Sequence, residues 1–119
     1  MIVLINPFEV PLELSDEAFL AGWQQAADYL RAQPGFVRST LHRAVSPEPR
    51  FRFINVAEWE SPEAFRAAVG SEAWAAIARQ SASPGYPALY QVVRTIGDDV
   101  GHGGDAARQP APAGARGES

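Results

Sequence analysis

Four stretches of the chain alternate apolar and polar residues with the period of two that is typical of β-strands. In the first, residues 1–10, one face carries Ile2, Leu4, Asn6, Phe8 and Val10. In another, residues 51–59, one face carries Phe51, Phe53, Asn55, Ala57 and Trp59. Each of these apolar rows contains a single strongly polar side chain. Since a buried amide without a partner costs about 1–3 kcal/mol, we expect Asn6 and Asn55 to be hydrogen-bonded or to face a pocket.

A helical spacing of apolar residues follows the first strand. Ser15 is a good N-cap, and Asp16 and Glu17 favour the positive end of a helix dipole. The apolar positions that come next are Phe19, Trp23, Ala26, Ala27 and Leu30. This spacing predicts a helix over residues 15–32, which the sequence QPGF ends because proline and glycine disfavour its continuation.

Two shorter helices are predicted after the strand at residues 51–59. Ser61 and Pro62, in the sequence SPEAF, are typical of an N-cap and a first helical position. Ser71, directly after a glycine, caps the next helix. The remaining two strands are predicted over residues 36–45 and 88–96.

The predicted order of elements, β-α-β-β-α-α-β, packs economically as a ferredoxin-like α+β sandwich. Its antiparallel sheet has the strand order 4-1-3-2, so that the first and third strands are central neighbours. Asn6 and Asn55 then lie on adjacent strands, beneath the helices.

The other face of this sheet is apolar as well, since it carries Val3, Ile5, Ile54 and Val56. All predicted helices lie on the opposite side, which leaves this face exposed unless a partner covers it. A second copy of the sheet is the simplest cover and predicts a homodimer. A monomer that tolerates a weakly apolar surface is the alternative.

The composition excludes several classes of function. The 119 residues suit one domain, and the net charge of −4 and the pI near 5.1 argue against a nucleic-acid partner. No stretch resembles a signal peptide or approaches the roughly 20 apolar residues that span a membrane, so we expect a cytoplasmic protein without a membrane partner. The absence of cysteine excludes thiol catalysis, disulfides and thiolate metal sites. Residues 97–119 have almost no large apolar side chains, which predicts a disordered tail behind a domain of residues 1–96.

Four motifs carry a resemblance to a known family. They are the INPF start, the QPGF junction, the NVAEW strand and the SPEAF helix that follows it. In this order and at these separations they resemble the antibiotic biosynthesis monooxygenase (ABM) family over residues 1–96. The resemblance implies a dimer whose two sheets pack into an α+β barrel, with a pocket in each subunit between sheet and helices.

The resemblance also implies a chemistry. Cofactor-free members of the family convert polyketide anthrones and related phenols to quinones with molecular oxygen. An asparagine on the first strand and an Asn-x-x-x-Trp pattern on the third line their pocket, and Asn6, Asn55 and Trp59 match these positions. These three are the predicted catalytic residues, with a small aromatic substrate, O2 as co-substrate and no cofactor. Their neutral donors suit the stabilisation of an oxyanion on the substrate.

Further side chains are candidates for substrate contacts: Phe53, His42, Tyr90, Arg94, Trp23 and Trp74. The two tryptophans are also typical of core positions, and either Arg94 or Arg38 is a source of positive charge. His42 is a candidate base. An even-numbered hairpin loop places it on the face of Asn55, and an odd-numbered loop points it into the barrel. No spacing of His, Asp and Glu resembles a metal site.

Three other functions are open to the same fold. The haem-degrading members of the family need an axial histidine on the later helix, and residues 71–80 contain none. A polyketide cyclase or isomerase would use the same pocket without oxygen. A small-molecule-binding dimer would perform no reaction. Oxygen uptake with anthrones and hydroquinones separates the oxygenase from the latter two.

Overall fold

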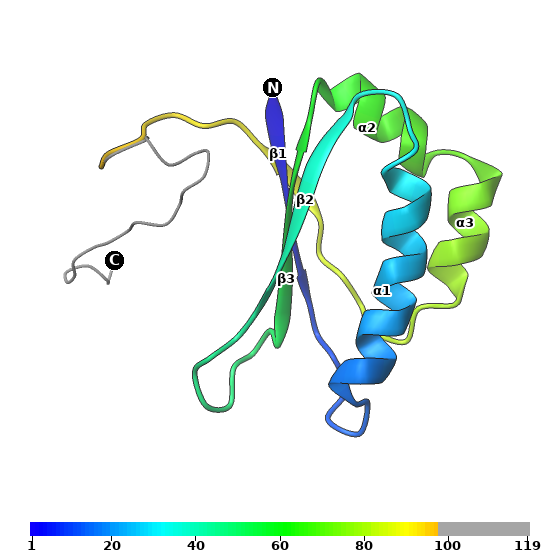
Figure 1. Ribbon diagram of the computed structural model, residues 1–119, viewed down its shortest axis with the longest axis vertical. Helices are drawn as coiled ribbons and strands as arrows, with labels where there is room; N and C mark the ends of the chain where they lie inside the picture. Colours follow the sequence, from blue (N-terminus) through cyan, green and yellow to red (C-terminus); the bar gives the residue numbers. More distant parts are fainter. Residues whose placement is uncertain (98–119) are drawn as a thin grey trace.

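The computed structural model describes residues 1–97 as a four-stranded antiparallel sheet with three helices on one of its faces (Figure 1). The elements in chain order are β1 (Ile2–Phe8), α1 (Asp16–Leu30), β2 (Phe36–Arg43), β3 (Phe53–Trp59), α2 (Pro62–Val69), α3 (Glu72–Arg79) and β4 (Ala88–Tyr90). The strand order β2-β3-β1-β4 confirms the predicted ferredoxin-like arrangement. The predicted disordered tail concerns residues that, apart from Gly97, lie outside the described part of the chain.

Serine side chains start all three helices, as the sequence predicts. The hydroxyl oxygen of each serine accepts a hydrogen bond from the backbone N–H three residues later, at 3.1 Å for Ser15, 3.1 Å for Ser61 and 3.0 Å for Ser71.

Within residues 1–97, no helix is long and apolar enough to cross a membrane.

The two central strands, β1 and β3, pair without a register shift from Ile2 opposite Trp59 to Phe8 opposite Phe53. Pro7 fits within β1 because its carbonyl oxygen accepts from the Tyr86 N–H at 3.0 Å, on the side away from β3. The N–H that proline lacks would point to that same side in an antiparallel strand, so the pairing with β3 loses no hydrogen bond.

The last strand is shorter than the sequence predicts. Residues 88–96 alternate like a strand, but β4 covers only Ala88–Tyr90. Tyr90 pairs with Val3 near the start of β1, so the residues after it soon have no partner strand. Alternation alone does not form a strand when the neighbouring edge ends. The first strand is shorter as well, since it ends at Phe8 and not at residue 10.

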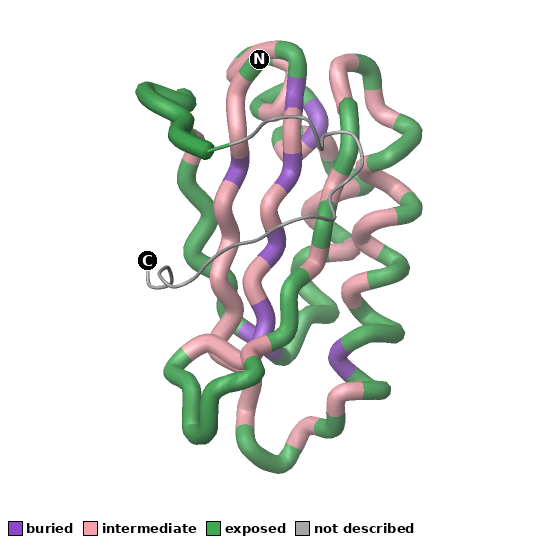
Figure 2. Tube along the Cα trace, turned by 60° about the vertical axis from the view of Figure 1, so that its left-hand side comes forward, coloured by how far each residue is buried: buried purple, intermediate pink, exposed green. Residues whose placement is uncertain are grey.

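The two faces of the sheet have different surroundings. The helix face carries Leu4, Asn6, Phe53, Asn55, Ala57 and Trp59, and the open face carries Val3, Ile5, Ile54 and Val56. Along β3 every second residue is buried, beginning with Phe53 (Figure 2).

Apolar clusters occupy both ends of the helix face. At one end Phe19 of α1 stacks on Phe53 at 4.5 Å between ring centroids and meets the ring of Phe8 edge-on at 5.2 Å. At the other end Trp59 is surrounded by the side chains of Leu4, Ala57, Ala68, Phe36 and Phe65. Asn6 and Asn55 lie between these clusters.

Close approaches join the three helices to one another and to the junction after α1. Gly35, in the QPGF junction, has a φ of 88°, and a Cβ atom there would collide with the Cβ of Ala64 on α2. Tyr29 of α1 donates to the carbonyl of Ala68 at 3.1 Å and lies 2.6 Å from the hydroxyl of Ser71. These contacts fix α1 against α2 and against the start of α3.

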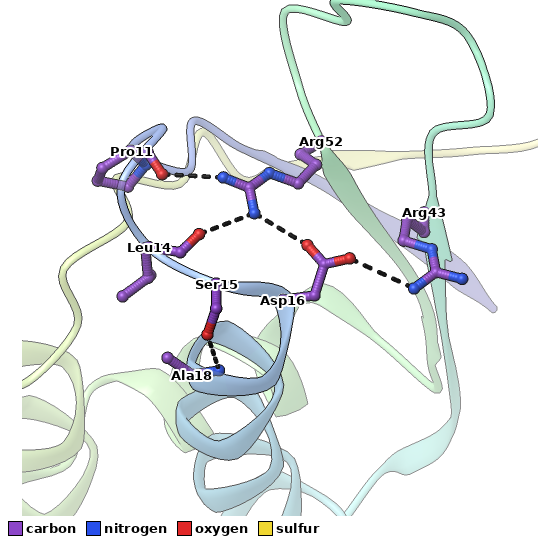
Figure 3. A network of polar contacts seen from close by, with 7 residues as sticks. All are labelled: Pro11, Leu14, Ser15, Asp16, Ala18, Arg43 and Arg52. Atoms are coloured by element: carbon purple, nitrogen blue, oxygen red, sulfur yellow. Dashed lines mark hydrogen bonds and ion pairs between the residues drawn. The ribbon is translucent and has the colours of Figure 1, made fainter.

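An arginine anchors the connection between β1 and α1. The guanidinium of Arg52 donates to the carbonyls of Pro11 and Leu14 at 2.8 and 2.9 Å and to the carboxylate of Asp16 at 2.9 Å (Figure 3). Arg43 contacts the same carboxylate at 3.4 Å. The hydrogen bond from Arg52 is the main cause that lowers the pKa of Asp16 below its ordinary value.

Candidate functional site

Asn55 is held by a neighbour on the adjacent strand. The residue is only 7% exposed, and its Oδ1 accepts a hydrogen bond from the hydroxyl of Ser39 on β2 at 2.5 Å. No hydrogen bond from its Nδ2 to the described residues is found. The amide therefore has its acceptor end satisfied and its donor end available.

Asn6, directly opposite Asn55, has the complementary free group. Its Oδ1 is buried and has no hydrogen-bond partner among residues 1–97. The backbone of Gly85 packs against this amide, since a Cβ atom there would lie 2.8 Å from Oδ1 and 3.3 Å from Nδ2. A buried acceptor without a partner costs about 1–3 kcal/mol, so this oxygen is an unfavourable feature of the fold unless it gains a partner.

The two amides form a mixed donor and acceptor pair. Opposed residues of an antiparallel pair have Cβ atoms about 4.5–5.5 Å apart. The Nδ2–H of Asn55 and the Oδ1 of Asn6, which packs against Gly85, are both without a hydrogen bond to residues 1–97. This combination matches a ligand that presents both a hydroxyl group and an oxygen acceptor at one edge.

Few helix residues are fully buried above the sheet. Phe19 is the only buried residue of α1, and α3 has none. Trp23 of α1 and Trp74 of α3, both predicted substrate contacts, are half-buried, and the Trp74 ring lies 5.9 Å from that of Tyr29. The two tryptophans are thus partly accessible members of the helix layer that covers the amide pair.

Trp59 and Phe53, the other predicted members on the helix face, flank Asn55 on β3. Trp59 is 1% exposed, with its ring edge-on to Phe36 at 5.4 Å and to Phe65 at 5.6 Å. It is four residues from Asn55, which corresponds to about 13 Å along a strand. Phe53 is also buried, and it lies two residues before Asn55 on β3.

The structure does not bring His42, Tyr90 and Arg94 to the amide pair. Leu41 is opposite Asn55, so His42 is opposite Ile54 on the open face, where its Nδ1 lies 3.3 Å from the Ile54 carbonyl oxygen. Tyr90 pairs with Val3 and is on the open face too. Arg94 is exposed beyond β4. Arg38, the alternative source of charge, forms an ion pair with Glu58 at 3.2 Å.

The segment Ser81–Pro87 is a part of the site that the sequence indicated only as a loop. It runs beside the end of β1, where the Glu9 N–H donates to the Pro84 carbonyl at 2.9 Å. Tyr86 donates to the Glu9 carboxylate at 2.7 Å. This bond lowers the pKa of Glu9, which Arg50 lowers further, and it raises the pKa of Tyr86.

Ser83, in the same segment, is 5% exposed, and its hydroxyl has no hydrogen-bond partner among the described residues. Neither Ser83 nor Ser39 has a sequence signal that distinguishes it from an ordinary loop or strand serine. Gly85 was detectable only as part of the turn-forming sequence SPGYP.

A small cavity lies away from the amide pair. It has a volume of about 240 Å³ and is lined by Gln33, Pro34, Gly35, Glu60, Ala64, Ala67 and Ala68. Neither Asn6 nor Asn55 lines this cavity. Its lining residues do not include a nucleophile with a neighbouring base or a cluster of metal ligands.

Few side chains in residues 1–97 could ligate a metal ion or haem iron. They contain no cluster of three or more His, Cys, Asp or Glu side chains that could hold a metal ion. His42 is the only histidine in this part of the chain, and it lies on the open face. The helix face thus offers amides and aromatic rings, and it lacks an axial histidine for haem iron.

This geometry defines a ferredoxin-like α+β protein with paired amides between its sheet and its helices. Residues 1–80 match the family described as antibiotic biosynthesis monooxygenase, and the chain belongs to this family. A comparison with curated proteins finds no match.

Several solved structures are similar to the chain. A proposed monooxygenase from Shewanella loihica PV-4 is 35% identical with a TM-score of 0.69, over 79% of this chain and 95% of that protein. SnoaB, a cofactor-independent oxygenase from Streptomyces nogalater, is 25% identical with a TM-score of 0.69, over 82% of this chain and 97% of SnoaB. The haem degrader MhuD from Mycobacterium tuberculosis is 32% identical with a TM-score of 0.60, over 82% of this chain and all of MhuD. The fold therefore occurs in both oxygenases and haem degraders.

Proposed function

We propose that this protein is a cofactor-independent monooxygenase that oxidises an anthrone-type or phenolic aromatic with O2 to a quinone or, from a hydroquinone, to a hydroxylated quinone product. The observation that carries the proposal is the opposed pair of Asn6 and Asn55, which offers an unpaired buried acceptor and a free donor on an otherwise apolar face. Family membership and the similarity to SnoaB support the reaction class.

The chemistry needs binding and charge stabilisation more than a reactive side chain. An electron-rich anthrone or phenol, once deprotonated, can reduce oxygen by itself. For an anthrone, the CH2 carbon loses two hydrogens and gains one oxygen atom, and the second atom of O2 leaves as water. The protein's part is to hold the aromatic in a dry site and to stabilise its oxyanion.

The two amides divide this work. Asn55 donates its Nδ2–H to the oxygen that becomes negative, and Asn6 accepts from a hydroxyl of the same substrate. The aromatic rings of Phe53 and Trp59 provide the apolar surroundings at either side of Asn55. Trp59 remains the third proposed member of the site through its indole N–H.

Haem degradation is the second candidate, favoured by the 32% identity to MhuD. The available iron ligands do not favour haem degradation. Helix α3, Glu72–Arg79, has no histidine, and His42 lies on the opposite face of the sheet from the helices. A haem between sheet and helices would have no imidazole from residues 1–97 as an axial ligand.

The open face supports a homodimer. Val3, Ile5, Ile54 and Val56 form an apolar strip on it, and the described helices all lie on the other side. A second sheet packed on this strip would bury it in both copies. We therefore propose another copy of the chain as the partner.

Oxygen uptake by the purified protein with dithranol, a dihydroxyanthrone, and with a hydroquinone tests the activity directly. Uptake above the buffer rate, with quinone formed in proportion, is the expected result. Product that forms equally without oxygen would indicate a cyclase or isomerase. Flavin or haem that copurifies in a one-to-one ratio would refute the cofactor-free mechanism.

A further inference from the structure

Ser39 makes the only side-chain hydrogen bond found for Asn55 within the described residues. Its hydroxyl lies 2.5 Å from Oδ1, a short distance for a hydrogen bond between neutral groups. In the register of β2 and β3, Ser39 is opposite Ala57 and therefore diagonal to Asn55 on the helix face. The contact therefore depends on the register of the two strands.

We propose that Ser39 is a positioning residue that fixes which end of the Asn55 amide faces the substrate. This inference rests on the proposed function of the amide pair. An asparagine amide can rotate by half a turn and exchange its oxygen for its NH2 group at little steric cost. With Oδ1 bound to Ser39, the NH2 group is the end that remains for the substrate.

The orientation determines what the pair can recognise. Asn6 presents an acceptor, so a fixed Asn55 donor makes the two amides different from each other. A ligand with a hydroxyl and an oxygen acceptor at one edge satisfies both. A ligand of the same shape without the oxygen acceptor leaves the Asn55 donor unpaired. Without Ser39 the Asn55 amide can turn its oxygen toward the ligand, so this discrimination is lost.

The test compares two substitutions of nearly equal shape. Ser39→Val removes the hydroxyl, and Ser39→Thr keeps it on a similar branched side chain. Thr40→Val is the matched control, because Thr40 is opposite Val56 on the open face of the same strand. Two quantities are measured: the turnover of dithranol, and the NMR signal of the Asn55 side-chain NH2, identified by its absence in Asn55→Leu.

In S39V we expect the Asn55 NH2 signal to shift and turnover to fall by about tenfold, less than the 10²–10³-fold loss of an oxyanion donor. In S39T the NH2 signal and the turnover should both be close to those of the wild type, and T40V should change neither the signal nor the turnover. The preference of binding for dihydroxyanthraquinone over the dihydroxyanthracene that lacks the carbonyl acceptors should also shrink in S39V. An unchanged NH2 signal in S39V would overturn the inference whether or not the wild type oxidises dithranol. A wild type that is inactive, with a shifted signal in S39V, would refute the proposed function and leave the positioning contact intact.

Discussion

Asn6 and Asn55 are direct partners across the central β1–β3 pair, yet only Asn55 has its side-chain oxygen hydrogen-bonded by the described protein. The same residue type at opposed positions therefore has two different energetic states. Asn55 is stabilised by Ser39, whereas the Asn6 oxygen is buried with no partner among residues 1–97. The two residues should consequently respond differently to the same substitution.

Asn6→Leu removes an unpaired buried acceptor and keeps a similar volume. We expect the free energy of unfolding to rise by about 1 kcal/mol while the turnover of dithranol falls. Urea unfolding and initial rates measure the two effects on one preparation. A loss of stability without a loss of turnover would show that the Asn6 oxygen has a structural partner and no role with the substrate.

Asn55→Leu removes the proposed oxyanion donor and also the partner of Ser39. Turnover should fall by roughly 10- to 1,000-fold, because the interaction is strongest in the transition state. Stability should not rise as it does in N6L, since a satisfied hydrogen bond is lost. Steady-state kinetics on a validated substrate provide the check, and an unchanged kcat would refute the catalytic role of Asn55.

Gly85→Ala places a methyl group against the Asn6 amide, 2.8 Å from Oδ1 and 3.2 Å from the Phe8 ring. The amide has to move, so we expect reduced turnover together with a loss of about 1–3 kcal/mol of stability. Gly22→Ala is the control, because Gly22 is in α1 and a Cβ there meets nothing within 4 Å. That variant should gain about 0.5–1 kcal/mol and retain its turnover. Equal behaviour of the two variants would contradict the close packing of Gly85 on Asn6.

The Asp16 carboxylate should make stability depend on pH in the acid range. Its pKa is lowered below the ordinary 3.8, mainly by the hydrogen bond from Arg52. Its contribution is therefore present above pH 3.8 and is lost as the pH falls through the folded-state pKa. Asp16→Asn should flatten this acid part of the curve in urea unfolding. In an Arg52→Met background the same substitution should have little further effect, and a full effect there would exclude Arg52 as the cause.

Val56→Glu introduces a charge into the apolar strip of the open face, opposite Ile5 and Thr40. If a second copy packs on this strip, the variant should be a monomer in light scattering at concentrations where the wild type is a dimer. Val45→Glu is the same change at a residue that is 98% exposed in the hairpin loop, and it should leave the dimer intact. A monomeric wild type would refute the dimer itself.

The sequence by itself determined the elements and their order. Serine N-caps, the QPGF junction and the alternation of Phe53, Asn55, Ala57 and Trp59 are local patterns that depend only on neighbouring residues. They were enough to predict the ferredoxin-like topology, and with it the opposition of Asn6 and Asn55, because that topology makes β1 and β3 neighbours.

Only the tertiary structure decided the features that depend on register and on contacts between distant segments. The position of Leu41 opposite Asn55 sends His42 to the open face, since a shift of one residue reverses every side chain of a strand. The same register brings Ser39 to Asn55, and the path of the Ser81–Pro87 segment brings Gly85 to Asn6. No local sequence pattern indicates these roles of Ser39 and Gly85, because the asparagine that each of them contacts is far away along the chain.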